Sequence, residues 1–293
     1  MGTELDSRGV DTHDALWSAL ALTTAPEAVR QVHTDYLEAG ARVITTNTYQ
    51  ATLPALLRAG HDAHRAREVI AAGARLAGEA ARRFEAEHPE AQLLIAGGLG
   101  PYGAYLADGS EYTGVYDVGA LDAPVFRDVH LPRIEMLAGE GIDLFALETL
   151  PRLDEAQALV GAVEDLAAES ECWVSFQVRP DGTHLADGTP LAEAAAWAAD
   201  QETVVAVGVN CVAPDVVARA LPVLHEATTK PLVAYPNSGD LYDPATKTWK
   251  AGEEGDGLAA LAPSWGASGV RLIGGCCRTR PAQIRELAHA LGA

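Results

Sequence analysis

Residues 272–281, near the C-terminus, carry the sequence Leu272-Ile273-Gly274-Gly275-Cys276-Cys277-Arg278-Thr279-Arg280-Pro281. The apolar run that begins at Gly269 ends at two glycines and two adjacent cysteines, and Pro281 then gives a helix start signal. A strand followed directly by a helix is the repeating unit of a parallel α/β sheet. Two thiols are therefore expected at the point where this strand ends.

A third cysteine follows a second apolar run. Adjacent cysteines seldom form a disulfide with each other, because consecutive Cα atoms lie about 3.8 Å apart and an ordinary disulfide needs about 4.4–6.8 Å. The run 204–209 ends at Asn210 and Cys211. Since parallel strands end on one face, Cys211 is expected to meet Cys276 and Cys277 there. Three thiolates with an open fourth position suit catalytic zinc; three buried cysteines acting as small apolar side chains are the alternative.

Apolar strands alternate with helices along the rest of the chain. Strands are predicted at 41–49, 92–96, 142–147, 173–178, 204–209, 231–235 and 269–273. Helices are predicted near 12–40, 62–87, 122–139, 153–169, 190–199, 214–227, 257–265 and 281–291. This alternation predicts an α/β fold, a (β/α)8 TIM-type barrel that lacks or truncates its first strand, because seven strands are one short of eight. An open doubly wound sheet is the alternative, but its glycine-rich phosphate turn is missing after the first strand.

The composition limits the possible partners. The chain has 293 residues, of which 48% are hydrophobic, and a net charge of −20. This charge argues against nucleic acid or an anionic membrane as a partner, and it favours a cationic small molecule. No apolar stretch approaches the roughly 20 residues of a membrane span, and the start resembles no signal peptide. A cytoplasmic protein, monomeric or a small homo-oligomer, is predicted.

Two long connections follow predicted strands and are rich in aromatic residues. The first, 101–121, holds four of the eight tyrosines, and the second, 236–257, holds one more and a tryptophan. Aromatic faces attract cations by roughly 0.5–2 kcal/mol, so a sulfonium substrate is one interpretation. The alternative is that the rings only pin the loops to the barrel rim. The residues concerned are Tyr102, Tyr105, Tyr112, Tyr116, Tyr242 and Trp249.

Three further residues are singled out by their positions. Glu148 follows the apolar strand 142–147 and is expected to face the barrel mouth, where it can hold a substrate ammonium group. A buried ion pair with Arg179 is the alternative for Glu148. Trp17 belongs either to the core or to a pocket wall. Cys172 opens a different strand and is expected in the core.

Two sets of residues carry a resemblance to a known family. Gly208-Val209-Asn210-Cys211, taken with Gly274-Gly275-Cys276-Cys277, resembles the zinc signature of the homocysteine S-methyltransferase family, and the likeness extends over essentially the whole chain. The stretches 100–112 and 235–239 resemble the branch that uses S-methylmethionine. Family members usually begin with an apolar strand and an Asp-Gly turn, which this chain lacks. Its start at Met1 is therefore expected to be truncated.

The resemblance implies an activity and a set of site residues. It implies one homocysteine-binding barrel domain over 1–293, with Zn2+ on the three cysteines and the homocysteine amino group on Glu148. The expected reaction is methyl transfer from S-methylmethionine, or from S-adenosylmethionine, to the thiol of L-homocysteine in methionine biosynthesis. Further substrate contacts are expected from Trp17, Tyr49, Gln50, Asn210, Tyr102, Tyr105 and Asn237.

Two other functions stay open from the sequence. Gly274 and Gly275 with Arg278 and Arg280 could form a phosphate-binding turn, which would make the protein a barrel enzyme for a phosphorylated small molecule. Alternatively, the adjacent thiols could serve a zinc or thiol sensor without catalysis.

Overall fold

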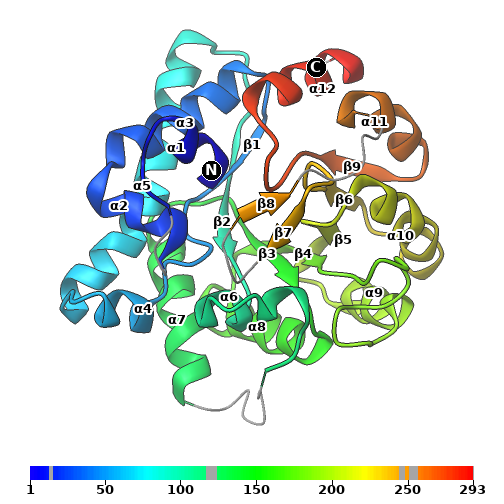
Figure 1. Cartoon of the computed structure of the whole chain (residues 1–293), viewed down its shortest axis with the longest axis horizontal. Helices are drawn as coiled ribbons and strands as arrows, with labels where there is room; N and C mark the ends of the chain where they lie inside the picture. Colours follow the sequence, from blue (N-terminus) through cyan, green and yellow to red (C-terminus); the bar gives the residue numbers. More distant parts are fainter. Residues whose placement is uncertain (13–15, 117–123, 244–247, 251–256, 293) are drawn as a thin grey trace.

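A computed structural model of the chain describes residues 1–12, 16–116, 124–243, 248–250 and 257–292. Seven parallel strands form one sheet in the order β1-β2-β3-β4-β5-β6-β9, so strands that follow one another in the chain lie side by side. The sheet curls, and the long helices surround it (Figure 1). The strands are β1 Val43–Thr45, β2 Leu94–Leu99, β3 Leu144–Leu150, β4 Glu171–Phe176, β5 Val204–Asn210, β6 Leu232–Tyr235 and β9 Val270–Ile273.

Local chemistry fixes where several of the helices begin. Pro26, Pro214 and Pro281 each occupy the first helical turn, and the Asp62 side chain accepts a hydrogen bond from the Arg65 amide. The region predicted as one helix, 12–40, is broken before Pro26, because the residue preceding a proline is disfavoured in helical geometry. The helices are α1 Gly2–Ser7, η1 Trp17–Leu20, α2 Ala21–Thr24, α3 Pro26–Glu38, α4 Leu53–Arg58, α5 Ala63–Glu87, α6 Tyr102–Leu106, η2 Ser110–Tyr112, α7 Pro124–Gly139, α8 Leu153–Leu166, α9 Leu191–Asp200, α10 Pro214–Ala227, α11 Leu258–Ala267 and α12 Pro281–Leu291.

Both faces of the sheet are buried, which explains why the strands are apolar throughout. Along β3, Phe145 and Leu147 pack in the layer under the outer helices, while Leu144 and Ala146 belong to a smaller cluster with Trp173. This is the period-two alternation of a strand. Cys172 is fully buried in the outer layer, which confirms the prediction that it belongs to the core.

The two edge strands of the sheet are β1 and β9, and no eighth strand joins them among the described residues. The seven predicted strands are confirmed. Contacts beyond the sheet tie its two edges together: the Tyr36 hydroxyl donates to the Thr279 carbonyl over 2.7 Å, and the Arg278 amide donates to the Thr3 hydroxyl over 3.0 Å. The structure is therefore a curled sheet of seven parallel strands, as in a TIM-type barrel short of one strand.

Both long connections contain regular structure that the sequence analysis missed. The first holds α6 and η2, and the second holds an antiparallel hairpin of β7 Leu241–Asp243 and β8 Thr248–Lys250. Residues 117–121 of the first connection, and 244–247 and 251–256 of the second, lie outside the described residues, as do the side chains of Tyr242 and Trp249.

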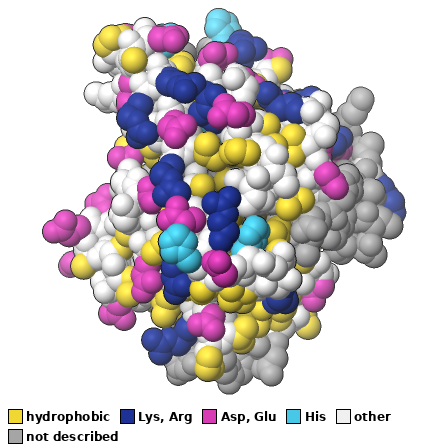
Figure 2. Space-filling model, turned by 90° about the vertical axis from the view of Figure 1, so that its left-hand side faces the viewer, with side chains coloured by type: hydrophobic (Ala, Val, Ile, Leu, Met, Phe, Trp, Pro, Cys, Tyr) yellow, Lys and Arg dark blue, Asp and Glu magenta, His cyan; other side chains and the backbone are white. Residues whose placement is uncertain are grey.

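The side of the molecule shown in Figure 2 carries basic and acidic side chains interspersed rather than in patches of one sign. Among the ion pairs of the described residues, Arg30 of α3 contacts Glu27, and Arg75 of α5 contacts both Glu68 and Glu140. Within the described part of the chain, none of the helices combines the length and the apolar character that crossing a membrane requires.

Candidate metal centre and active site

The three cysteines singled out in the sequence converge at the carboxyl ends of the strands. Cys211 directly follows β5, and Cys276 and Cys277 follow β9 after two glycines. Their Sγ atoms all lie within 4.8 Å of one another, and the Cys211 and Cys277 Sγ atoms are 3.6 Å apart. Tetrahedral zinc with Zn–S bonds of about 2.3 Å requires S···S distances of about 3.8 Å. The three thiols are therefore close enough to bind a single metal ion.

Backbone contacts hold these thiols in place. The Cys276 amide donates to the Pro236 carbonyl over 2.7 Å, and the Ser238 amide donates to the Cys277 carbonyl over 3.1 Å. The Asn237 side chain donates to the Cys211 carbonyl over 3.3 Å. The loop after β6 thus braces both cysteine segments. Asn237, predicted to contact substrate, lies in this brace and is absent from the cavity lining described below.

The thiols are protonated in the metal-free protein. A hydrogen bond with Cys211, together with burial, raises the pKa of Cys276 well above its usual range. Because zinc binds thiolates, loading the site with metal has to release protons.

A cavity of about 650 Å³ opens beside the three thiols. Its walls come from the first helical region, the segment after β1, the η2 region and the strand ends. Of the residues predicted to contact substrate, Glu148, Trp17, Tyr49 and Gln50 line it. The aromatic part of the lining also includes Tyr112, one of the loop aromatics of the sulfonium interpretation. Trp173 and Tyr235 line the cavity as well, and the sequence analysis did not assign either of them to the site.

Glu148 lies within β3 and presents its carboxylate to the cavity. Burial raises the pKa of Glu148 to about 7, and a hydrogen bond from the Tyr235 hydroxyl partly opposes this effect. Tyr235 is itself oriented by Trp173, whose indole N–H donates to the hydroxyl over 2.9 Å. No ion pair joins Glu148 to Arg179 among the described residues, and the Arg179 Nε donates instead to the Ala186 carbonyl.

Asn210 connects Glu148 to Cys211 without touching the cavity. It is fully buried; its Oδ1 accepts from the Thr149 amide over 2.7 Å, and its Nδ2 donates to the Thr149 hydroxyl over 2.8 Å. Thr149 and Cys211 both have left-handed backbone geometry, with φ of 62° and 53°, which is uncommon for residues with side chains. The amide of Asn210 therefore fixes the strained turn that aims Glu148 beside the thiols.

The four tyrosines of the first connection separate into two groups. Tyr112 lines the cavity, and its hydroxyl lies 4.0 Å from the Cys211 Sγ. Tyr102, Tyr105 and Tyr116 are absent from the cavity lining and pack among themselves, with the Tyr102 ring centre 5.4 Å from that of Tyr105 and 5.8 Å from that of Tyr116. These three rings hold the connection against the body of the protein.

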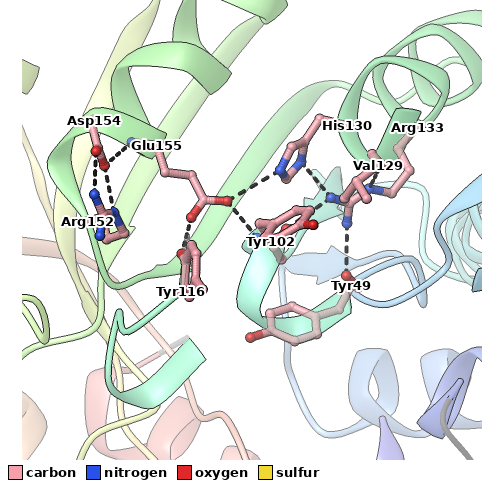
Figure 3. Close-up of polar contacts among 10 residues, drawn as sticks. Tyr49, Tyr102, Tyr116, Val129, His130, Arg133, Arg152, Asp154 and Glu155 are labelled. Carbon is pink, nitrogen blue, oxygen red and sulfur yellow. Dashed lines mark hydrogen bonds and ion pairs between the residues drawn. The ribbon is translucent and has the colours of Figure 1, made fainter. Parts of the chain in front are cut away.

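A buried charge network anchors the same connection (Figure 3). The Glu155 carboxylate accepts from the Tyr102 amide over 2.6 Å and from the Tyr116 hydroxyl, and its Oε1 lies 3.3 Å from the His130 Nε2. The His130 Nδ1 lies 2.7 Å from an Arg133 nitrogen. Because Arg133 can only donate, His130 accepts at Nδ1 and carries its proton at Nε2. Burial lowers the pKa of His130 to about 4, so the ring is neutral and bridges the two charges.

Arg133 extends this network to the cavity wall. Its guanidinium donates to the Tyr49 carbonyl over 2.8 Å and to the Gly100 carbonyl over 3.0 Å. Gly100 has to be small, because a Cβ there would lie 2.7 Å from the Tyr49 ring. The network thus fixes the positions of the segment that carries Tyr49 and of the connection that carries Tyr112.

The arginines of the phosphate-binding alternative face carboxylates. The Arg278 Nε lies 2.9 Å from an Asp240 oxygen, and the Arg280 Nε lies 3.8 Å from a Glu4 oxygen. Neither residue lines the cavity. This arrangement gives no support to a phosphate site at the glycine turn.

Fold and site together define an α/β protein of the TIM-barrel type with a candidate three-thiolate metal centre at the carboxyl ends of its strands. A family model described as homocysteine S-methyltransferase matches residues 1–291. The homocysteine S-methyltransferase of Escherichia coli (strain K12) is 47% identical over 98% of this chain and 92% of its own length. The homocysteine S-methyltransferase YbgG of Bacillus subtilis (strain 168) is 41% identical over 98% of this chain and 91% of its own length. The chain belongs to the homocysteine S-methyltransferase family.

Solved structures of one relative agree with this assignment. The metallated form of the homocysteine methyltransferase MmuM from Escherichia coli superposes with a TM-score of 0.88 at 43% identity, covering 99% of this chain and 93% of that chain. The apo form of the same enzyme gives a TM-score of 0.78 over the same shares of the two chains. A metal therefore occurs in a structural relative, and the cysteine cluster of this chain can hold one.

Proposed function

We propose that this protein transfers a methyl group from a sulfonium donor to the thiol of L-homocysteine, giving L-methionine, with Zn2+ bound by Cys211, Cys276 and Cys277. The observation that carries the proposal is the convergence of three thiols beside a cavity that also holds the Glu148 carboxylate. Relatives named homocysteine S-methyltransferase support the acceptor. The chemistry of the thiols supports the metal, because thiolates are soft ligands that suit zinc.

Zinc held by three thiolates would supply a Lewis acid that keeps the homocysteine thiol deprotonated at neutral pH. Glu148 would bind the α-ammonium group of homocysteine and thereby orient its sulfur toward the cysteines. Through its hydrogen bonds to Thr149, Asn210 would keep Glu148 in a fixed position relative to Cys211. The aromatic walls would exclude water, which favours a step in which a thiolate and a sulfonium neutralise each other.

The donor in this proposal is an S-methylmethionine-type sulfonium, with S-adenosylmethionine as a second possible donor. Tyr49 and Tyr112 support a cationic donor, because both line the cavity near the thiols and aromatic faces stabilise cations. With S-methylmethionine, the donor loses one methyl group and both products are methionine. One homocysteine-binding domain over 1–293 is part of the same proposal; cytoplasmic location and oligomeric state stay predictions.

The proposed reaction is tested with zinc-loaded protein, L-homocysteine and S-methylmethionine, by measuring methionine formed per donor consumed. We expect two methionines per donor, with turnover lost after chelation and restored by zinc. Turnover that persists at zero metal content would contradict the role of the thiols. Metal binding without turnover on any sulfonium would support the sensor alternative instead.

A further inference from the structure

A second carboxylate lines the cavity, forms no ion pair among the described residues and has no role in the reaction described so far. Glu111 lies in η2 and lines the cavity next to Tyr112. Its position is rigid, because η2 packs directly on α6: a Cβ at Gly103 would lie 2.5 Å from the Glu111 amide nitrogen. Tight backbone packing of this kind leaves the Glu111 side chain little freedom to turn toward solvent.

The Glu111 carboxylate is buried without a counter-charge. Glu111 is only 8% exposed, and its Oε2 accepts no hydrogen bond from the described residues. None of the ion pairs in the described part of the chain includes it. Burial raises the pKa of Glu111 to about 7, with a smaller contribution from Asp108 and an opposing hydrogen bond from its own backbone. A buried acceptor without a partner destabilises the ligand-free protein.

A neutral acceptor in the same wall is also unsatisfied. The Gln50 amide nitrogen donates to the Ala104 carbonyl over 2.8 Å, which orients the side chain and leaves its Oε1 without a partner among the described residues. Gln50 lines the cavity, and Ala104 belongs to α6, next to Gly103. On the side of the cavity formed by α6 and η2, the described lining residues thus include two unsatisfied acceptors, Glu111 Oε2 and Gln50 Oε1, and no Lys or Arg.

A cation that donates hydrogen bonds would satisfy both acceptors and would also neutralise the Glu111 carboxylate. A sulfonium group has no N–H or O–H, so it can be stabilised by aromatic faces but cannot satisfy these oxygens. An ammonium group carries three donors and a positive charge. In the proposed function, Glu148 binds the ammonium group of homocysteine. A methyl donor that is an amino-acid sulfonium carries a second ammonium group. Tyr112 connects the two regions, because it follows Glu111 and reaches toward Cys211.

We propose that Glu111, assisted by Gln50, binds the α-ammonium group of the methyl donor, so that the site selects amino-acid sulfonium compounds over sulfonium compounds without an amine. This assignment rests on the proposed function, since it concerns the donor of that reaction. In this assignment Glu148 binds the ammonium group of the methyl acceptor, and Glu111 binds the ammonium group of the methyl donor.

Calorimetric titration of the zinc-loaded protein tests the assignment. The ligands are S-methylmethionine and 4-dimethylsulfoniobutanoate, which is the same sulfonium without its amine. We expect the wild type to bind the deaminated ligand about tenfold more weakly or worse, as the loss of a charge-assisted hydrogen bond implies. This comparison needs no variant. Equal affinity for the two ligands would overturn the assignment.

The variant Glu111→Gln keeps the shape and removes the charge. We expect it to bind S-methylmethionine about tenfold more weakly and 4-dimethylsulfoniobutanoate as the wild type does. Its ligand-free melting temperature should equal or exceed that of the wild type, because an uncompensated buried charge is removed. The exposed Glu193→Gln is the control for net charge and should change neither affinity. Unaltered S-methylmethionine affinity in Glu111→Gln would overturn the assignment.

Turnover measured on the same samples separates this assignment from the proposed function. If the wild type turns over and Glu111→Gln has an unchanged donor KM, the assignment fails and the function stands. If the wild type binds S-methylmethionine through Glu111 without turnover, the function fails and the assignment stands. If the wild type neither binds the donor nor turns over, both fail.

Discussion

Two residues in left-handed backbone geometry, Thr149 and Cys211, border the candidate site, and Asn210 holds them together. Such geometry costs on the order of 1–3 kcal/mol and persists only where the surroundings enforce it. Here the fully buried Asn210 amide supplies that restraint. Residues that never touch a ligand can therefore decide the position of those that do.

The metal proposal is tested at a single ligand, Cys276. Cys276→Ser replaces a soft thiolate by a hydroxyl that binds zinc poorly, so zinc content and turnover should fall together, with turnover reduced more than about 100-fold. Metal analysis and the methionine assay on one preparation check this. Cys172→Ser, in the core, is the control and should keep its zinc. Full zinc occupancy and full activity in Cys276→Ser would contradict the assignment of Cys276 as a metal ligand needed for turnover.

The acceptor role is tested at Glu148. Glu148→Gln keeps the side chain's size and its contact with Tyr235 but loses the charge that pairs with an ammonium group. The KM for homocysteine should rise about 10- to 100-fold, as the loss of a charge-assisted hydrogen bond implies, with a much smaller change in the donor KM. Steady-state kinetics with both substrates varied check this. An unchanged homocysteine KM would leave Glu148 with a structural role only.

At the scale of elements, the connection between β2 and α7 depends on α8. Glu155, at the start of α8, binds the Tyr102 amide and the Tyr116 hydroxyl and faces the buried Arg133 through His130 (Figure 3). Arg133 is fully buried, and Glu155 supports its charge. One carboxylate thus fastens the element that carries Glu111 and Tyr112.

Removing that carboxylate should destabilise the whole protein. Glu155→Gln leaves the Arg133 charge buried without compensation, and we expect a loss of about 3–5 kcal/mol in the free energy of unfolding, measured with urea. The matched control is Glu140→Gln, whose partner Arg75 is 40% exposed in its side chain; that pair should contribute less than about 1 kcal/mol. Equal effects of the two substitutions would show that the network contributes no more than a surface ion pair.

At the scale of the whole molecule, the cysteines link separate strands of the sheet. Cys211 follows β5, while Cys276 and Cys277 follow β9, and β6 lies between these two strands. A bound metal would therefore join the last three strands at their carboxyl ends. Since β9 is an edge strand, this link would also stabilise one side of the opening between β9 and β1.

Zinc removal should accordingly lower the melting temperature. A ligand present at about 100 times its dissociation constant stabilises by about 2.7 kcal/mol, which corresponds to about 5–10 °C for a protein of this size. Calorimetry before and after chelation measures the difference, and added zinc should restore it. Cys276→Ser, treated in the same way, should show no shift. If chelation leaves the wild-type melting temperature unchanged, bound metal does not stabilise the folded protein.

The sequence by itself determined the seven strands, most of the long helices between them and the meeting of the three cysteines. The physical reason is local: strands buried on both faces are continuous apolar runs, and residues that follow such strands share one face of a parallel sheet. Glu148 could be singled out for the same reason. These inferences need only the order of residues along the chain.

Only the tertiary structure decided which polar residues face the cavity and which serve as supports. Asn210 and Asn237 lie in supporting hydrogen bonds, while Glu111 lines the cavity with an Oε2 that has no hydrogen-bond partner among the described residues. The contacts responsible join residues far apart in the chain, such as Glu155 with the Tyr102 amide 53 positions away. Whether a buried acceptor is satisfied depends on every element packed around it, and no local pattern records that.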